Sequence, residues 1–264
     1  MNRYFIKLSY KGTNYQGWQS QPGKTTVQGE LNNALQLILR EKICITGAGR
    51  TDSGVHAINF IAHFDSKSLE KKDTENLVYK LNRFLPYDII VHAIFLVDKD
   101  SHARFDAISR TYHYLISHSK NPFLDDFSLH YPQVLDVELM NQACNSLIAP
   151  RDFASFSKLH GNNKTTMCEV RNAEWRWVSP ELLVFKISAD RFLRNMVRAI
   201  TGTMLKIGSH KISPEGFEEI IMKKNRSAAG TSVNGKGLFL SEILYENIEI
   251  PPGNFHLLNE SFFF

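Results

Sequence analysis

The sequence predicts an α+β protein in which helices pack on one face of mostly antiparallel sheets. Segments that alternate like strands and segments with helical periodicity are interspersed along the whole chain. They do not form the long βαβ series that would build a parallel sheet, and short turn signals such as Ser179-Pro180 join neighbouring strands. The 264 residues suffice for one large domain or two smaller ones, each with a substantial core.

The first half begins with a strand over residues 3–10, which alternate and are rich in aromatic and branched side chains. A loop rich in glycine and amides follows, and Thr25 with Gln28 predicts a capping box at the start of a helix. The further elements expected in this half are a strand at 59–65, a helix that carries Leu77, Leu81, Phe84 and Leu85 and ends before Pro86, and strands at 88–97 and 109–118.

The second half is expected to contain three helices and three strands. Ser213 as an N-cap and Pro214 at the first helical position mark the clearest helix start. The tail after Tyr245 is expected to dock its apolar side chains on the body or on a partner. In chain order the elements are a helix at 136–148, a hairpin of strands at 172–178 and 181–189, a helix at 191–207, the helix from Ser213, and a strand at 237–245. Because the halves share a rough order of elements, we expect two related domains, 1–105 and 106–264.

Composition sets broad limits on function. The formal net charge of +4 is compatible with nucleic-acid binding but does not establish it. The apolar runs are shorter than a bilayer span requires, and the N-terminus has no apolar block of signal-peptide length. The three cysteines lie far apart in the chain. We therefore expect a cytoplasmic protein without a structural zinc site.

The stretch "GAGRTDSGVH", residues 47–56, is the most informative motif. It lacks the lysine and following hydroxyl of a phosphate-binding P-loop, and Asp52 stands where the third glycine of a dinucleotide-binding loop would be. The triplet Asp52-Ser53-Gly54 is similar to the catalytic turn of aspartic proteases, but those enzymes need two such aspartates and the chain has one Asp-Ser-Gly. An ordinary tight turn, with glycines for positive φ, is the remaining local interpretation.

The extended motif "GAGRTDSGVHA" resembles the signature of the TruA family of tRNA pseudouridine synthases. The resemblance runs from about Tyr4 to Tyr245, in family order. It departs from the family pattern at Ser53, where alanine is more usual, at Ser101, and in the loop at 230–237. The other blocks that carry it are "YKGTNYQGWQSQPGKTTVQGELNNAL", "LPYDIIV", "HARFDAISRTYHYLI", "DFASFSK", "FLRNMVRAITG" and "GLFLSEILY".

The resemblance implies a fold, a reaction and a set of site residues. The fold would be the pseudouridine synthase fold, with two related domains flanking a central basic cleft. The reaction would isomerise uridine to pseudouridine at positions 38, 39 and 40 of the tRNA anticodon arm, after the target nucleotide is flipped, without cofactor or metal. The family's catalytic aspartate matches Asp52, its ion partner matches Arg198, and its base-stacking tyrosine matches Tyr112. Arg50 matches the arginine that occupies the place of the extruded nucleotide.

Helical periodicity adds an argument for the arginines of the second half. On a helix over 191–207, Arg191, Arg194 and Arg198 would gather opposite an apolar side. Arg191 and Arg194 are then expected to contact RNA phosphate or surface carboxylates. His56 and His102 could serve as acid–base groups, but the family gives them no chemistry and we leave them out of the catalytic set.

We therefore expect a tRNA pseudouridine synthase that acts as a homodimer on the anticodon arm, with no membrane association. One alternative is a non-catalytic RNA-binding or tRNA-folding protein on the same scaffold. A more distant alternative is an aspartic-type hydrolase.

Overall fold

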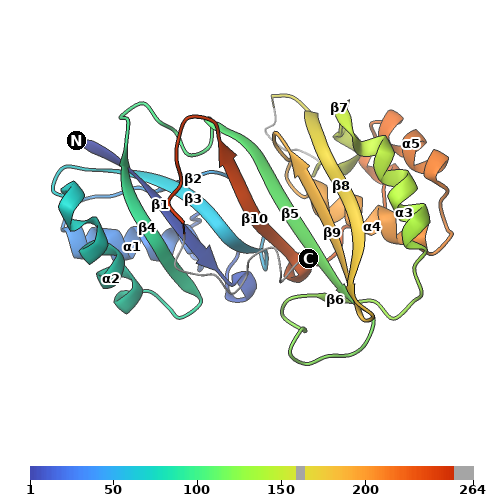
Figure 1. Ribbon diagram of the computed structural model, residues 1–264, viewed down its shortest axis with the longest axis horizontal. Coiled ribbons are helices and arrows are strands. Elements are labelled where there is room, and N and C mark those ends of the chain that lie inside the picture. The colour runs from blue at the N-terminus through green and yellow to red at the C-terminus, as the bar shows by residue number, and fades with distance from the viewer. Residues whose placement is uncertain (159–163, 253–264) are drawn as a thin grey trace. The chain divides into compact units, whose positions relative to one another are not determined.

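The computed structural model describes residues 1–158 and 164–252 (Figure 1). The described chain divides into two compact units. Unit 1 contains Met1–Ile108 and residues 240–252, and unit 2 contains residues 109–239. The C-terminal segment therefore returns to the unit in which the chain began.

Unit 1 is built on a sheet with the strand order β4-β1-β3-β10. β1 pairs antiparallel with β3 on one side and with β4 on the other. The two-residue strand β2 also pairs antiparallel with β3. The strand bounds are β1 Asn2–Tyr10, β2 Thr46–Gly47, β3 His56–Ser66, β4 Ile89–Val97 and β10 Leu238–Tyr245.

Two helices, α1 (Val27–Leu39) and α2 (Thr74–Phe84), pack beside each other and bury Leu31 and Leu81 completely (Figure 1). The predicted capping box at α1 is wrong. Thr26 is the N-cap, with its hydroxyl accepting from the Gly29 N–H. Gln28 is buried instead, and its amide joins two loops by donating to the Ile45 carbonyl at 2.7 Å and accepting from the Ser20 N–H at 2.7 Å.

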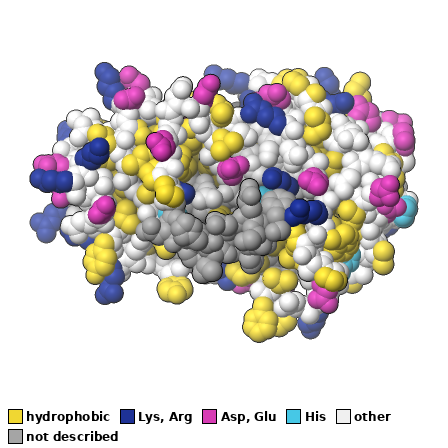
Figure 2. Space-filling model, in the orientation of Figure 1, with side chains coloured by type: hydrophobic (Ala, Val, Ile, Leu, Met, Phe, Trp, Pro, Cys, Tyr) yellow, Lys and Arg dark blue, Asp and Glu magenta, His cyan; other side chains and the backbone are white. Residues whose placement is uncertain are grey.

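The segment after β10 lies against unit 1. Lys7 Nζ donates to the Pro251 carbonyl at 3.1 Å, and Ile248 and Ile250 are half-buried. Hydrophobic side chains gather over β1, β4 and this segment in Figure 2. The tail thus docks on the body as far as Pro252, while the rest of it, residues 253–264, lies outside the described residues.

Unit 2 contains the strand order β5-β9-β8-β7, with antiparallel pairing throughout that path. The short β6 pairs parallel with the end of β5. The strand bounds are β5 Ala107–Ser117, β6 Leu129–His130, β7 Ala149–Asp152, β8 Met167–Ser179 and β9 Leu182–Ala189. The helices are α3 Val137–Cys144, α4 Met196–Gly208 and α5 Pro214–Met222.

The expected α+β fold with mostly antiparallel pairing is confirmed. Single-turn 3₁₀ helices complete the described elements, at Gly12–Asn14, Lys71–Asp73, Asn145–Leu147, Ala154–Phe156, Arg226–Ala228 and Gly235–Gly237. None of the helices in the described ranges combines the length and apolar character needed to cross a membrane.

One expectation about the helices is wrong in a way that bears on the site. The helix predicted over 191–207 begins only at Met196, because Asn195 takes a left-handed backbone conformation with φ of 69°. Arg191 and Arg194 therefore precede the helix and do not share a helical face with Arg198. Almost all of α4 is buried, which explains the apolar periodicity without a basic stripe.

Candidate active site

The Asp52 loop, residues 47–56, connects β2 to β3 and lies against the segment after β1. The Trp18 N–H donates to the Thr51 carbonyl at 3.2 Å, and the Gly54 N–H donates to the Tyr15 carbonyl at 3.3 Å. Within the loop, the Val55 N–H donates to the Asp52 carbonyl at 3.2 Å. The backbone on both sides of Asp52 is thus fixed by hydrogen bonds.

Glycines allow this close approach at particular positions. A Cβ at Gly17, where φ is 89°, would stand 2.4 Å from the Thr51 carbonyl oxygen. A Cβ at Gly47 would stand 2.6 Å from the Trp18 ring, which stacks on Phe60 with ring centroids 4.1 Å apart. Gly49, in contrast, has no atom of the described residues within 4 Å of a Cβ position, so nothing in that part of the chain crowds this glycine beside Arg50.

Side chains complete the attachment of the loop. The hydroxyls of Tyr10 and Thr51 are 2.9 Å apart and hydrogen bonded. The buried His56 accepts from the Gly12 N–H through Nδ1 at 3.0 Å, which gives it a structural role. Burial raises the pKa of Tyr15, and the hydrogen bond that its hydroxyl donates to Asp88 raises it further.

Of the side chains in the loop, those of Arg50, Asp52 and Ser53 reach solvent. Thr51 is buried, whereas Asp52 is half-buried and Arg50 is exposed. A loop with a fixed backbone and a half-buried carboxylate has the properties needed for a positioned catalytic group.

Tyr112 lies on β5 in unit 2, opposite Ile187 of β9. Its ring is half-buried and meets Phe192 edge to face, with centroids 5.1 Å apart and an interplanar angle of 86°. Tyr114, two residues further along, is fully buried, and its hydroxyl donates to the Asn234 carbonyl at 2.7 Å. Of these two tyrosines, Tyr112 therefore has ring surface that a ligand could contact, and Tyr114 is a core residue.

Arg198 lies in the first turn of α4 and is half-buried. Its Nε donates to the Val233 carbonyl at 2.7 Å, and the Val233 N–H donates to the Arg198 carbonyl at 3.2 Å. The segment at 230–233 packs tightly on the helix, and the glycine at position 202 permits this approach. A Cβ at Gly202 would stand 1.9 Å from the Thr231 carbonyl oxygen. The loop that departs from the family pattern thus holds Arg198 in place.

The other two arginines belong to the turn between β9 and α4. Arg191 is half-buried and Arg194 is exposed. The turn is fixed by the Asp190 carboxylate, which accepts from the N–H groups of Glu169 and Arg191 at 2.7 Å each. The Asp190 carbonyl also accepts from Arg110 Nη1 at 2.7 Å.

The six residues expected from the sequence thus fall into two groups, each on a well-supported local framework. Asp52 and Arg50 belong to one loop of unit 1, and Tyr112, Arg191, Arg194 and Arg198 belong to unit 2. The sequence did not indicate the roles of Tyr10, Tyr15 and Trp18, because they act through contacts distant along the chain. Within the described ranges, His, Cys, Asp and Glu form no group of three or more that could hold a metal ion.

Comparison with known proteins identifies relatives over almost the whole chain. A family model described as tRNA pseudouridine synthase matches residues 7–106 and 143–246. Tyr112 lies between these ranges, and the other candidate residues lie inside them.

Three relatives carry the name tRNA pseudouridine synthase A. A protein of Azobacteroides pseudotrichonymphae is 48% identical over 247 residues, which cover 94% of this chain and 98% of the relative. A protein of Parabacteroides distasonis is 49% identical over 245 residues, which cover 93% and 96%. A protein of Bacteroides thetaiotaomicron is 48% identical over 247 residues, which cover 93% and 91%.

Proposed function

The chain belongs to the tRNA pseudouridine synthase family and isomerises uridine in tRNA to pseudouridine, and we propose that Asp52 is its catalytic carboxylate. The observation that carries this proposal is the fixed backbone of the Asp52 loop. Trp18 and Val55 hold the carbonyls on either side of the Asp52 side chain, which stays half-buried. A rigid support of this kind holds a reacting group in one geometry.

The reaction defines what the carboxylate must do. The N1–C1′ bond of the uridine breaks, the uracil turns, and a C5–C1′ bond forms. The C5 proton leaves and N1 gains a proton, so the reaction has no net redox change. An ionised carboxylate held at the nucleoside can act on the base or on the sugar.

We further propose roles for the other candidates. Arg198 would be the cationic partner of Asp52, because an opposite charge favours the ionised form of a carboxylate in an enclosed site. Tyr112 would stack on the flipped uracil with its accessible ring. Arg50 would occupy the place of the extruded nucleotide, and Arg191 and Arg194 would contact phosphates.

The remaining expectations complete the proposal. The substrate sites would be positions 38, 39 and 40 of the anticodon arm, bound by a homodimer in the cytoplasm. The halves 1–105 and 106–264 would flank a basic cleft, which stays a prediction.

Release of tritium from C5-labelled uridine in tRNA tests the role of Asp52. Wild type should release tritium, and Asp52→Asn should lose release by at least about 1,000-fold while retaining tRNA binding. Ser53→Ala is the matched control: it removes the hydrogen bond from the exposed Ser53 hydroxyl to the Tyr15 carbonyl, which the Gly54 N–H still reaches, and should keep activity close to wild type. Full activity of Asp52→Asn would contradict the proposal.

A further inference from the structure

Arg104 and Phe105 stand out at the connection between β4 and β5, in the 98–106 loop. Phe105 is 75% exposed and Arg104 is exposed, whereas Ala103 and Ala107 on either side are buried. The Arg104 guanidinium lies 6.0 Å from the centroid of the Phe105 ring. An exposed aromatic ring next to a cation does not contribute to the core of unit 1.

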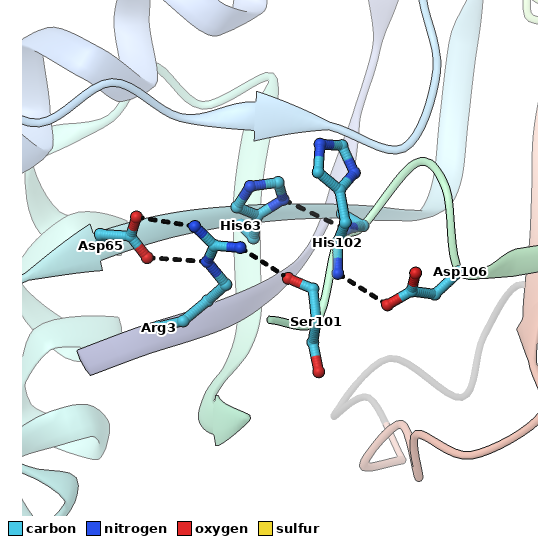
Figure 3. A network of polar contacts seen from close by, with 7 residues as sticks. Arg3, His63, Asp65, Ser101, His102 and Asp106 are labelled. Carbon is cyan, nitrogen blue, oxygen red and sulfur yellow. Dashed lines mark hydrogen bonds and ion pairs between the residues drawn. The ribbon is translucent and has the colours of Figure 1, made fainter. Parts of the chain in front are cut away.

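The base of this loop is anchored to the sheet (Figure 3). Arg3 binds Asp65 through Nε and Nη2 at 2.8 and 2.9 Å, and its Nη1 donates to the Ser101 carbonyl at 3.0 Å. The buried His63 accepts from the Ala103 N–H through Nδ1 at 3.1 Å. Burial lowers the pKa of His63 to about 4, so its ring stays a neutral acceptor near pH 7.

The tip of the loop is fixed by His102. Its Nδ1 accepts from the N–H groups of Arg104 and Phe105, at 3.1 and 3.3 Å. Its own backbone N–H donates to the Asp106 carboxylate at 2.7 Å (Figure 3). The imidazole also packs against the Phe105 ring with centroids 4.2 Å apart, and His63 packs edge-on against His102 at 4.6 Å. A series of three rings thus leads from the sheet to the exposed phenyl group.

The hydrogen bonds within the 98–106 loop affect how a ligand would bind there. The hydrogen bonds order the backbone before any ligand arrives, which reduces the entropy lost on binding. The exposed phenyl ring offers a π-face on which a nucleotide base can stack, and the adjacent guanidinium can bind phosphate. Stacking on an aromatic face suits unpaired bases, because paired bases are already stacked in a helix.

We infer that Arg104 and Phe105 form a second RNA contact, separate from the Asp52 loop, which takes an unpaired tRNA base on the Phe105 ring and a neighbouring phosphate on Arg104. The inference rests on the proposed function in that the ligand is tRNA. The contact serves binding and not the chemical step, so it is expected to affect KM and tRNA affinity.

The test compares Phe105→Leu, Phe105→Tyr and Arg104→Gln with wild type in tRNA binding and tritium release. Phe105→Leu keeps an apolar side chain without a π-face and should weaken affinity and raise KM by roughly 5- to 100-fold, with kcat at saturating tRNA within about twofold. Phe105→Tyr should retain wild-type affinity. Arg104→Gln should weaken binding and reduce the slope of log K against log salt concentration by about 1, whereas Phe105→Leu should leave that slope unchanged.

Tyr87→Ala is the matched control, because Tyr87 is a fully exposed aromatic residue of the same unit. It should bind tRNA like wild type. Unchanged affinity of Phe105→Leu, or a loss that Tyr87→Ala shares, would overturn the inference. A change in oligomeric state of Phe105→Leu with intact tRNA affinity would assign the ring to a protein contact and also overturn it.

Failure of the proposed function would have a different signature. If wild type bound tRNA without releasing tritium, the proposed chemistry would fail, while a selective loss of affinity in Phe105→Leu would still support the RNA contact. Tritium release by wild type together with unchanged affinity of Phe105→Leu would reject the RNA contact alone.

Discussion

Gly17 lies directly against the backbone of Thr51 and Asp52. A Cβ at Gly17 would stand 2.4 Å from the Thr51 carbonyl oxygen and 3.1 Å from the carbonyl carbon of Asp52. The position of the carboxylate therefore depends on a residue far from it in the sequence.

Gly17→Ala is expected to reduce activity and stability together. The left-handed backbone costs alanine about 1–2 kcal/mol, and the contact with the Thr51 carbonyl must also be relieved by movement of the loop. We expect kcat to fall at least about 10-fold in tritium release, since small displacements of a catalytic group are costly. Gly23→Ala is the control, because Gly23 has φ of 69° but its Cβ position has no atom of residues 1–158 or 164–252 within 4 Å. It should lose stability and keep kcat, and an equal kcat loss in both variants would contradict the argument.

Gly202→Ala is expected to destabilise unit 2. In a helix interior alanine is more favourable than glycine by about 1 kcal/mol. At position 202, however, the alanine Cβ would stand 1.9 Å from the Thr231 carbonyl oxygen. We expect a net loss of at least about 2 kcal/mol in the free energy of unfolding, measured in urea. Gly216→Ala in α5 is the matched substitution. The first atom that its Cβ would meet is in the Ile212 side chain, at 3.2 Å, and a side chain can move aside more easily than a backbone carbonyl. A Gly202→Ala protein as stable as Gly216→Ala would show that the segment at 230–233 can move away at little cost.

Arg198→Met is expected to reduce turnover far more than tRNA affinity. The substitution removes the charge proposed to face Asp52 and the Nε hydrogen bond to the Val233 carbonyl. We expect kcat to fall by roughly 100-fold or more, with the dissociation constant for tRNA changed by less than about threefold. Lys206→Met is the control, because Lys206 is an exposed cation on the same helix. Equal losses of kcat and affinity in Arg198→Met would place this arginine on the RNA-binding surface instead.

The stability of unit 1 is expected to fall as the pH drops from 7 to 5. Burial lowers the pKa of His63 from 6.5 to about 4, with further lowering from His102 and Arg3 and opposing effects of Asp65 and Asp106. Between these two pKa values the unfolded chain binds a proton that the folded chain does not, so acid favours unfolding. The effect of His63 at pH 5 is about 2 kcal/mol relative to pH 7.

His63→Asn provides the comparison for this pH dependence. An asparagine carbonyl can accept from the Ala103 N–H but does not titrate in this range. The loss in unfolding free energy between pH 7 and pH 5 should therefore be smaller in His63→Asn by about 2 kcal/mol. His92 and His113, whose pKa values burial lowers to about 4 and about 3, contribute equally to both proteins. Identical pH dependence of wild type and variant would exclude His63 as the source.

Much of the secondary structure was predictable because it depends on local pattern. The N-cap at Ser213 accepts from the Gly216 N–H as expected, and the hairpin of β8 and β9 turns near Ser179-Pro180. The start of α4 was predicted too early, at Arg191. Apolar residues from Leu193 onward continue the helical periodicity, although the left-handed Asn195 prevents the helix from beginning before Met196. Periodicity reports burial, and residues before a helix can be buried as well.

The candidate site was predictable only in part, for a physical reason. The Asp52 motif is contiguous in sequence, so the resemblance could locate it. Its supports are tertiary contacts from Tyr10, Gly12 and Gly17, and these have no local signature. The structural role of His56, which accepts from the Gly12 N–H, likewise depends on a tertiary contact that has no local signature.

The return of β10 to unit 1 has a consequence for biosynthesis. β3 pairs with β10, yet the chain of unit 2 is made between the two strands. At cellular synthesis rates this interval is on the order of ten seconds, during which the edge of β3 opposite β1 is paired only with the two-residue strand β2. The N-terminal unit therefore completes its sheet only after almost the entire chain has left the ribosome, and a nascent chain stalled before residue 238 would carry the Asp52 loop on an open sheet.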